Sequence, residues 1–73
     1  LYGGDDGLDF YREIAEKAKQ FLADDGTLIF EFGYNQGGEV MEIMMKNGFR
    51  NVEILKDLAG LNRVVFGELI PET

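Results

Sequence analysis

The chain of 73 residues is long enough for one small domain, and it contains neither cysteine nor histidine, which excludes disulfides, thiolate metal sites and a histidine general base. Fourteen acidic against seven basic side chains give a net charge of -7, which opposes the attraction behind nucleic-acid binding, so we expect no direct contact with DNA or RNA. No apolar run approaches the roughly 20 residues that cross a bilayer and no signal peptide is evident, so we expect a soluble, cytoplasmic protein that does not enter membranes.

The first periodic segment predicts an amphipathic helix at about residues 8–22. We expect Asp6 to cap its first turn, Asp9 to place a negative charge at the positive end of the helix dipole, and Gly26 to provide the exit. Apolar side chains recur at helical spacing and are expected to form the buried stripe: Phe10, Tyr11, Ile14, Ala15, Ala18, Phe21 and Leu22.

Residues 27–33 are typical of a strand covered on both faces, because apolar side chains occupy both alternating sets and turn signals flank the run. A second helix is predicted at about residues 38–47, with Gly48 as the left-handed residue that ends it and Phe49 folding back on its last turn. Its apolar stripe is expected to be core rather than an adaptable binding surface and consists of Val40, Met41, Ile43, Met44 and Met45.

Two further extended segments are predicted at residues 51–56 and 63–70. The loop of about six residues between them is short enough for an antiparallel hairpin, whereas a helix between the first two strands requires a crossover to a parallel partner. The predicted order is helix, strand, helix, strand, strand in a mixed α/β sheet. Lys56, Asp57 and Arg63 flank the hairpin loop and are expected to form an exposed ion-pair cluster of little energetic weight.

Two stretches carry a resemblance to a known family: residues 3–12 (GGDDGLDFYR) and residues 56–65 (KDLAGLNRVV). In sequence, order and spacing they resemble the carboxyl-terminal part of the HemK/PrmC family of S-adenosylmethionine-dependent methyltransferases. The resemblance implies part of a class I methyltransferase (Rossmann-like) fold in which the last strand is antiparallel and lies between the two preceding strands. Residues 1–73 would then form a single partial domain.

The resemblance also implies a function for a parent enzyme, which is methylation of the glutamine in the Gly-Gly-Gln motif of peptide-chain release factors. The family's glycine-rich cofactor loop and its Asn-Pro-Pro-Tyr catalytic motif would both precede Leu1. No catalytic or cofactor-binding residue is therefore assigned, and the chain alone is expected to be inactive and to bind no S-adenosylmethionine. The alternative hypothesis is a small independent α/β protein-interaction domain without catalysis.

Candidate substrate-binding residues follow from the position of the first strand, because ligands of open α/β sheets bind beyond the carboxyl ends of the strands. Glu31, Gly33, Asn35 and Gln36 gather there, together with Tyr34. The alternative is structural, with Glu31 at a partly exposed strand position and the amides as ordinary loop or capping residues. Residues 3–7 (GGDDG) lack a P-loop lysine and are interpreted as a turn and cap rather than a phosphate cradle.

Self-association is the last expectation. The resemblance implies that the first strand pairs with a preceding strand and that one sheet face packs partly on elements that precede this chain. An uncovered edge and an apolar face readily pair with another chain. We expect a dimer or larger assembly formed through the edge of residues 27–33, the uncovered sheet face or exchange of a terminal element, with Leu28, Ile29, Phe30 and Phe32 among the residues that it buries.

Overall fold

The structure, a computed structural model, describes residues 7–32 and 36–70, apart from the side chains of Asn62 and Arg63. Within these residues the chain forms the helices α1 (Asp9–Phe21) and α2 (Gly37–Lys46) and the strands β1 (Thr27–Glu31), β2 (Phe49–Lys56) and β3 (Asn62–Leu69). The predicted order of elements and the α/β class are confirmed. Neither described helix is long and apolar enough to span a membrane.

The strands form one sheet in the order β1-β3-β2. The central strand β3 runs antiparallel to both neighbours, with Phe66 opposite Ile29 on β1 and opposite Glu53 on β2. β1 and β2 therefore run parallel to each other, as expected for strands joined through a helix. The position of the last strand between the two earlier ones confirms what the family resemblance implied.

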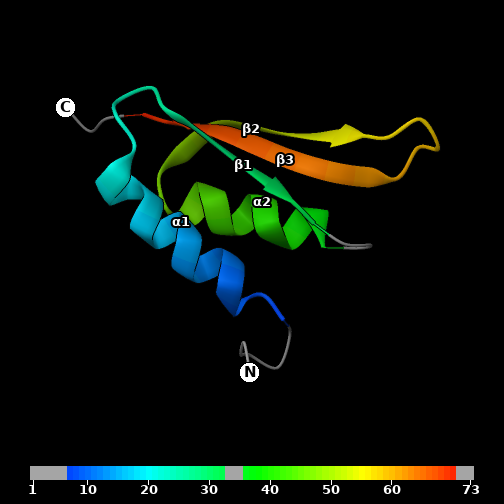
Figure 1. Cartoon of the computed structure of the whole chain (residues 1–73), viewed down its shortest axis with the longest axis horizontal. Helices are drawn as coiled ribbons and strands as arrows, with labels where there is room; N and C mark the ends of the chain where they lie inside the picture. Colours follow the sequence, from blue (N-terminus) through cyan, green and yellow to red (C-terminus); the bar gives the residue numbers. More distant parts are fainter. Residues whose placement is uncertain (1–6, 33–35, 71–73) are drawn as a thin grey trace.

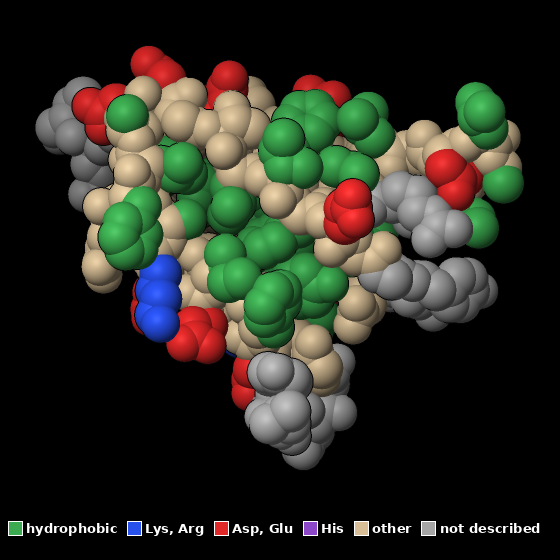
Figure 2. Space-filling model, viewed as in Figure 1, with side chains coloured by type: hydrophobic (Ala, Val, Ile, Leu, Met, Phe, Trp, Pro, Cys, Tyr) green, Lys and Arg blue, Asp and Glu red, His purple; other side chains and the backbone are tan. Residues whose placement is uncertain are grey.

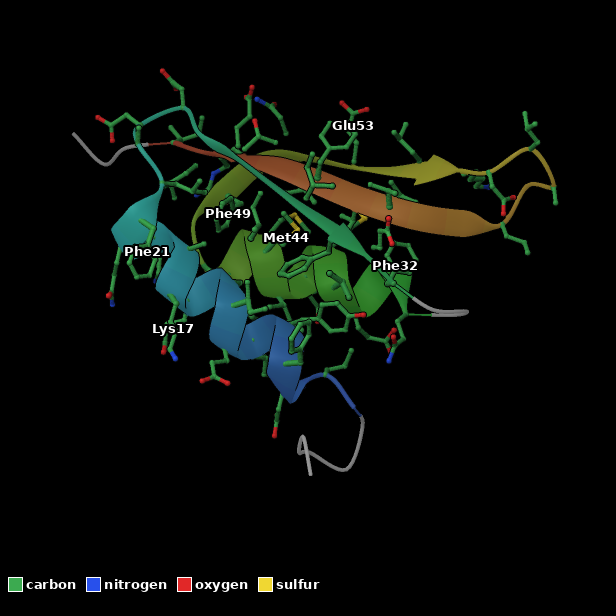
Figure 3. The ribbon with its side chains drawn as sticks, viewed as in Figure 1. Lys17, Phe21, Phe32, Met44, Phe49 and Glu53 are labelled. Carbon is green, nitrogen blue, oxygen red and sulfur yellow. The ribbon has the colours of Figure 1, made fainter. Side chains whose placement is uncertain are left out.

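Both helices lie on one side of the sheet, with α2 directly beneath the strands and α1 beside α2 (Figure 1). The largest fully buried side chains are Val40, Met44, Phe49 and Val65, which come from α2, β2 and β3. Figure 3 shows Met44 and Phe49 on the helix side of the sheet and Glu53 pointing away from the helices. The core thus lies between α2 and one sheet face.

Helix α1 packs through a narrower stripe than its sequence predicts. Ala15 is fully buried, and Tyr11, Ile14, Ala18 and Leu22 are partly buried against the core. Phe21 is 81% exposed, and Figure 3 shows it pointing away from the sheet; Phe10 is also exposed. The expectation that Phe10 and Phe21 are buried was wrong because, among the described elements, α2 and β1 flank this helix and cover a limited arc of its surface.

The first turn of α1 also differs from the prediction. Its N-cap residue is Leu8, which provides no side-chain cap hydrogen bond, and the expected cap Asp6 lies outside the described residues. Asp9 lies in the first turn as predicted, and its Oδ1 atom is 2.6 Å from Nη1 of Arg12. The pair is exposed, and the Asp9 carboxylate lies at the N-terminus of α1, where its negative charge interacts favourably with the helix dipole.

The turn after α1 is fixed by Asp25, which has a φ of 67°, rather than by Gly26. Asp25 N donates to Leu69 O and Leu69 N donates to Gly26 O, so the turn is hydrogen-bonded to the end of β3. β1 then ends at Glu31 instead of residue 33, and Ile29 is 61% exposed. The expectation that this strand is covered on both faces was wrong, because the helices of this chain cover one face only.

Helix α2 starts at Gly37 and ends at Lys46, one residue earlier at each end than predicted. Met44 is buried and Met41 is partly buried, as expected of core methionines, but Met45 is exposed. Gly48 has a φ of 92°, which confirms the predicted left-handed stop. Phe49 follows it into the core.

Strand β2 starts at Phe49, two residues before the predicted start, because Phe49 and Arg50 pair with Leu69 and Glu68 of β3. A register shift follows between Arg50 and Glu53, where Asn51 has a φ of 56°. Such a bulge bends a strand and leaves a residue unpaired in the ladder. Asn51 Nδ2 instead donates to Glu68 Oε1 at 2.8 Å.

Candidate functional site

The candidate site lies at the end of the sheet where β1 and β2 both have their carboxyl termini. β1 ends at Glu31, and α2 begins close by, with Gln36 as its N-cap residue. The β2–β3 hairpin loop is at the same end, since β2 leads into it. The connection from β1 to α2 and the β2–β3 loop, which is distant from it in sequence, therefore lie at the same end of the sheet (Figure 1).

Two of the four candidate residues are described by the structure. Glu31 is exposed at the last position of β1, and Gln36 is partly buried before the first turn of α2. Gly33 and Asn35 lie outside the described residues, as does Tyr34. The backbone O of Gln36 accepts a hydrogen bond from Val40 N at 3.0 Å, but its side chain makes no cap hydrogen bond. The Gln36 amide is thus not used to cap α2.

Tyr11 connects α1 to this end of the sheet. Its ring meets the ring of Phe30 edge-on, with centroids 5.1 Å apart and planes at 85°. Its hydroxyl donates to the backbone O of Glu31 at 3.4 Å. The helical spacing predicts Tyr11 in the apolar stripe of α1 but does not predict its hydrogen bond to Glu31 O. A tyrosine within an apolar helix stripe is itself a signal, since a buried tyrosine hydroxyl usually finds a hydrogen-bond partner.

A hollow of about 370 Å³ opens beside Tyr11 and is lined by Gly7, Phe10, Tyr11 and Gln36. Gly7 has a φ of 74°, and a Cβ at this position would lie 3.8 Å from Nε2 of Gln36. The hollow therefore combines an aromatic wall with a phenol hydroxyl and a side-chain amide. These groups suit a polar, uncharged ligand group such as a peptide or a carboxamide, which both donates and accepts hydrogen bonds.

The described residues at this end do not contain a cluster suited to a metal ion, because no group of three or more carboxylates with metal-binding geometry occurs among them. Nor is any charged or polar side chain of the described residues buried. This arrangement can form hydrogen bonds with a ligand at the solvent-accessible rim of the sheet, where β1 and β2 have their carboxyl termini.

The hairpin loop is organised by hydrogen bonds of Asp57. Asp57 Oδ1 accepts hydrogen bonds from Ala59 N at 2.9 Å and Leu61 N at 3.0 Å. Asp57 N also donates to Leu61 O at 2.8 Å, and Gly60 N donates to Asp57 O at 2.9 Å. The predicted ion-pair cluster of Lys56, Asp57 and Arg63 stays a prediction, because the Arg63 side chain lies outside the described residues.

Comparison with known proteins places this geometry in context. No model of a protein family matches the chain. It is 43% identical over 65 residues to the release factor glutamine methyltransferase of Thermodesulfovibrio yellowstonii, covering 89% of this chain and 23% of that protein. The chain is homologous to a segment of release factor glutamine methyltransferases. It is also 48% identical over 63 residues to the release factor glutamine methyltransferase of Neisseria gonorrhoeae, covering 86% of this chain and 23% of that protein.

The fold agrees with this homology to release factor glutamine methyltransferases. The crystal structure of a release factor-specific protein-(glutamine-N5) methyltransferase from Alicyclobacillus acidocaldarius matches with a TM-score of 0.72 and 36% identity. The match covers 94% of this chain and 44% of that one. The resemblance to the HemK/PrmC family and the assignment to part of a methyltransferase fold are confirmed. The chain spans about a quarter of the length of the curated relatives named here.

Proposed function

We propose that this chain is the carboxyl-terminal segment of a protein-glutamine N5-methyltransferase that methylates the Gly-Gly-Gln glutamine of peptide-chain release factors. The observation that carries the proposal is the 43% identity over 65 residues to a release factor glutamine methyltransferase. The similarity in fold to a release factor-specific enzyme, with a TM-score of 0.72, supports it. Residues 1–73 would be one partial domain of the whole enzyme.

The proposed reaction moves a methyl group from S-adenosylmethionine to a side-chain amide nitrogen. The sulfur–methyl bond breaks while a nitrogen–carbon bond forms, and the nitrogen loses one proton. An amide nitrogen is a poor nucleophile because its lone pair is delocalised, so acceleration depends on holding the amide in line and on preorganised dipoles around it. S-adenosylmethionine supplies the activated methyl group.

The described residues do not fit a cofactor site. The candidate end offers the exposed Glu31 carboxylate, the Tyr11 hydroxyl and the Gln36 amide, and residues 33–38 (GYNQGG) between β1 and α2 do not have the G-x-G-x-x-G spacing of a dinucleotide-binding loop. The proposal therefore assigns cofactor binding and catalysis to the part of the enzyme that this chain does not match. It assigns to this chain the support of the substrate entrance, framed by Glu31, Gly33, Asn35 and Gln36.

The proposal is tested by a chimera in which this chain replaces the matching 65-residue segment of the T. yellowstonii enzyme. The purified chimera is incubated with S-adenosylmethionine and an intact release factor, and addition of one methyl group to the Gly-Gly-Gln glutamine is measured by mass spectrometry. The expected result is methylation of that glutamine.

A second chimera provides the control for folding and assay. It carries Phe30→Asp, which places a charge at a position buried in the core and should abolish the fold and the activity together. A chimera with the unaltered chain that is folded by circular dichroism and still transfers no methyl group would contradict the proposal. That result would favour the independent interaction domain.

A further inference from the structure

The β2–β3 hairpin projects beyond the end of β1. Glu31, the last residue of β1, pairs with Val64, whereas the pairing of β2 with β3 continues to Lys56 and Asn62. The two residues from Val64 to Asn62 add about 7 Å at the usual rise of a strand, and the loop lies further out. Figure 1 shows the hairpin extending past the other elements on the side where β1 ends.

The projecting loop is apolar at its outer surface. In the loop, Leu58 is fully exposed at 108% and Leu61 is 42% exposed; Leu55, 53% exposed, lies at the base of the projection, where it pairs with Val64. Figure 2 shows hydrophobic side chains gathered at the outer end of the hairpin. Single exposed leucines are common on protein surfaces, but a group of them on one projection marks a contact with another molecule. We name Leu55, Leu58 and Leu61 the leucine tip.

The backbone under the leucine tip is held in one conformation. Asp57 takes part in four hydrogen bonds within residues 57–61, two through its carboxylate and two through its backbone. Gly60 has a φ of 85°, a conformation that side chains disfavour, so the turn depends on glycine there. A loop ordered before binding loses little conformational entropy on contact, which favours its use as a docking element.

We propose that the leucine tip docks into an apolar depression on the folded body of the protein substrate. This inference rests on the proposed function. The acceptor glutamine is one side chain of a folded protein, so when it enters a site at the carboxyl ends of the strands, the rest of that protein lies over the rim. The loop that carries Leu58 and Leu61 stands on this rim and extends furthest beyond the end of β1.

The chemistry of the tip and the charge of the chain favour a protein over a lipid surface. Lys56 and Arg63 are the cationic residues that flank the loop in the sequence, fewer than the clusters of about 4–8 that bind anionic headgroups. The net charge of -7 adds repulsion. An apolar pocket on a protein, by contrast, gains from the burial of each leucine without requiring opposite charge.

The test compares two substrates of the chimera described above. One is an intact release factor and the other is a short peptide with the Gly-Gly-Gln loop alone. Leu58→Ser is expected to lower the ratio of kcat/KM for the intact protein to that for the peptide about tenfold, mainly through KM, because one leucine no longer leaves water on docking. Leu58→Met should restore most of the ratio, since methionine keeps the apolar volume.

The matched control is Phe21→Ser, which removes another largely exposed apolar side chain at the far end of α1 and should leave the ratio unchanged. Binding of the intact release factor to each variant is measured in parallel by fluorescence anisotropy, which does not depend on turnover. A chimera that methylates both substrates with the same ratio in the Leu58→Ser variant overturns the docking role but leaves the proposed function standing. A chimera that neither binds nor methylates the release factor overturns both.

Discussion

Gly37 at the start of α2 lies directly against the ring of Phe32. A Cβ at position 37 would come within 2.9 Å of Phe32 Cζ and 3.0 Å of Ile54 Cδ1. We predict that Gly37→Ala lowers the free energy of unfolding by about 1–2 kcal/mol, since overpacking outweighs the better helix propensity of alanine. Urea unfolding followed by circular dichroism measures this change.

Gly38 provides the control because it occupies the next position of the same helical turn and has no atom within 4 Å of a Cβ placed there. Gly38→Ala should raise the free energy of unfolding by about 0.5 kcal/mol, because alanine reduces the conformational entropy of the unfolded chain and has a higher helix propensity than glycine. If both substitutions had the same effect, the close approach of Phe32 to Gly37 would not limit the packing.

Asp57 is expected to determine the stability of the hairpin loop. Asp57→Ala removes the carboxylate that accepts hydrogen bonds from the backbone N–H groups of Ala59 and Leu61. The free energy of unfolding should fall by about 1 kcal/mol, and Asp57→Asn, which keeps one carbonyl oxygen, should lose less. Amide hydrogen exchange of Ala59 and Leu61 reports the change directly. Unaltered exchange in Asp57→Ala would show that the loop is held without this side chain.

The elements of this fold could be predicted from the sequence because each has a local signal. The apolar period of α1, the β-branched and aromatic run of β1 and the left-handed Gly48 are properties of neighbouring residues. The position of β3 in the middle of the sheet has no such local signal, since pairing partners distant in sequence decide it. That prediction required the resemblance to a known family.

The errors arose where packing by distant elements decides exposure. Phe21 and Ile29 have the right periodicity for burial, yet no described element covers them. Gly67 shows the converse: glycine weakens a strand, but here a Cβ would lie 2.9 Å from Val52 Cγ2 and 3.1 Å from Met44 Cε, so glycine allows α2 to approach. The candidate site was located by the strand-end rule, but the Tyr11 contact and the leucine tip depend on tertiary structure.

Glu31 should contribute to substrate binding in the chimera without contributing to stability, because its side chain is exposed at the end of β1. Glu31→Gln is expected to lower kcat/KM for the release factor roughly fivefold, the effect of replacing a charge-assisted hydrogen bond to the substrate by a weaker neutral one. Glu53→Gln is the control, since Glu53 is also an exposed strand carboxylate, pointing away from the helices (Figure 3), but lies on β2 opposite Phe66 and not at the end of β1. Equal effects of the two changes would point to general charge rather than to a contact of Glu31.

The isolated chain is predicted to have no measurable affinity for S-adenosylmethionine and no methyltransferase activity. The reason is that the proposed cofactor and catalytic residues belong to the part of the relatives that this chain does not match. Isothermal titration calorimetry of the 73-residue chain with S-adenosylmethionine checks the first statement. A saturable heat with a dissociation constant below about 100 μM would contradict the prediction and would place a cofactor site within these residues.

Self-association remains a prediction, and the structure narrows the surface involved. β1 pairs with β3 on one side only, so the described sheet presents its other edge to solvent. Phe30 and Phe32 are already buried within the chain and Leu28 is partly buried, which leaves Ile29 as the exposed apolar residue of this segment. Ile29 lies opposite Phe66 on the face away from the helices.

We expect the chain to form dimers or larger assemblies through β1, because an exposed apolar edge strand pairs readily with a second copy. The charge of -7 on each copy opposes this contact, so added salt should strengthen it by screening. Ile29→Lys should weaken the assembly about tenfold or more, whereas Phe21→Lys, which introduces the same charge at an exposed site far from β1, should not. Sedimentation equilibrium at two salt concentrations measures all three proteins. A single 8.2 kDa species at high micromolar concentration in every condition would show that Ile29 and the free edge of β1 do not mediate self-association.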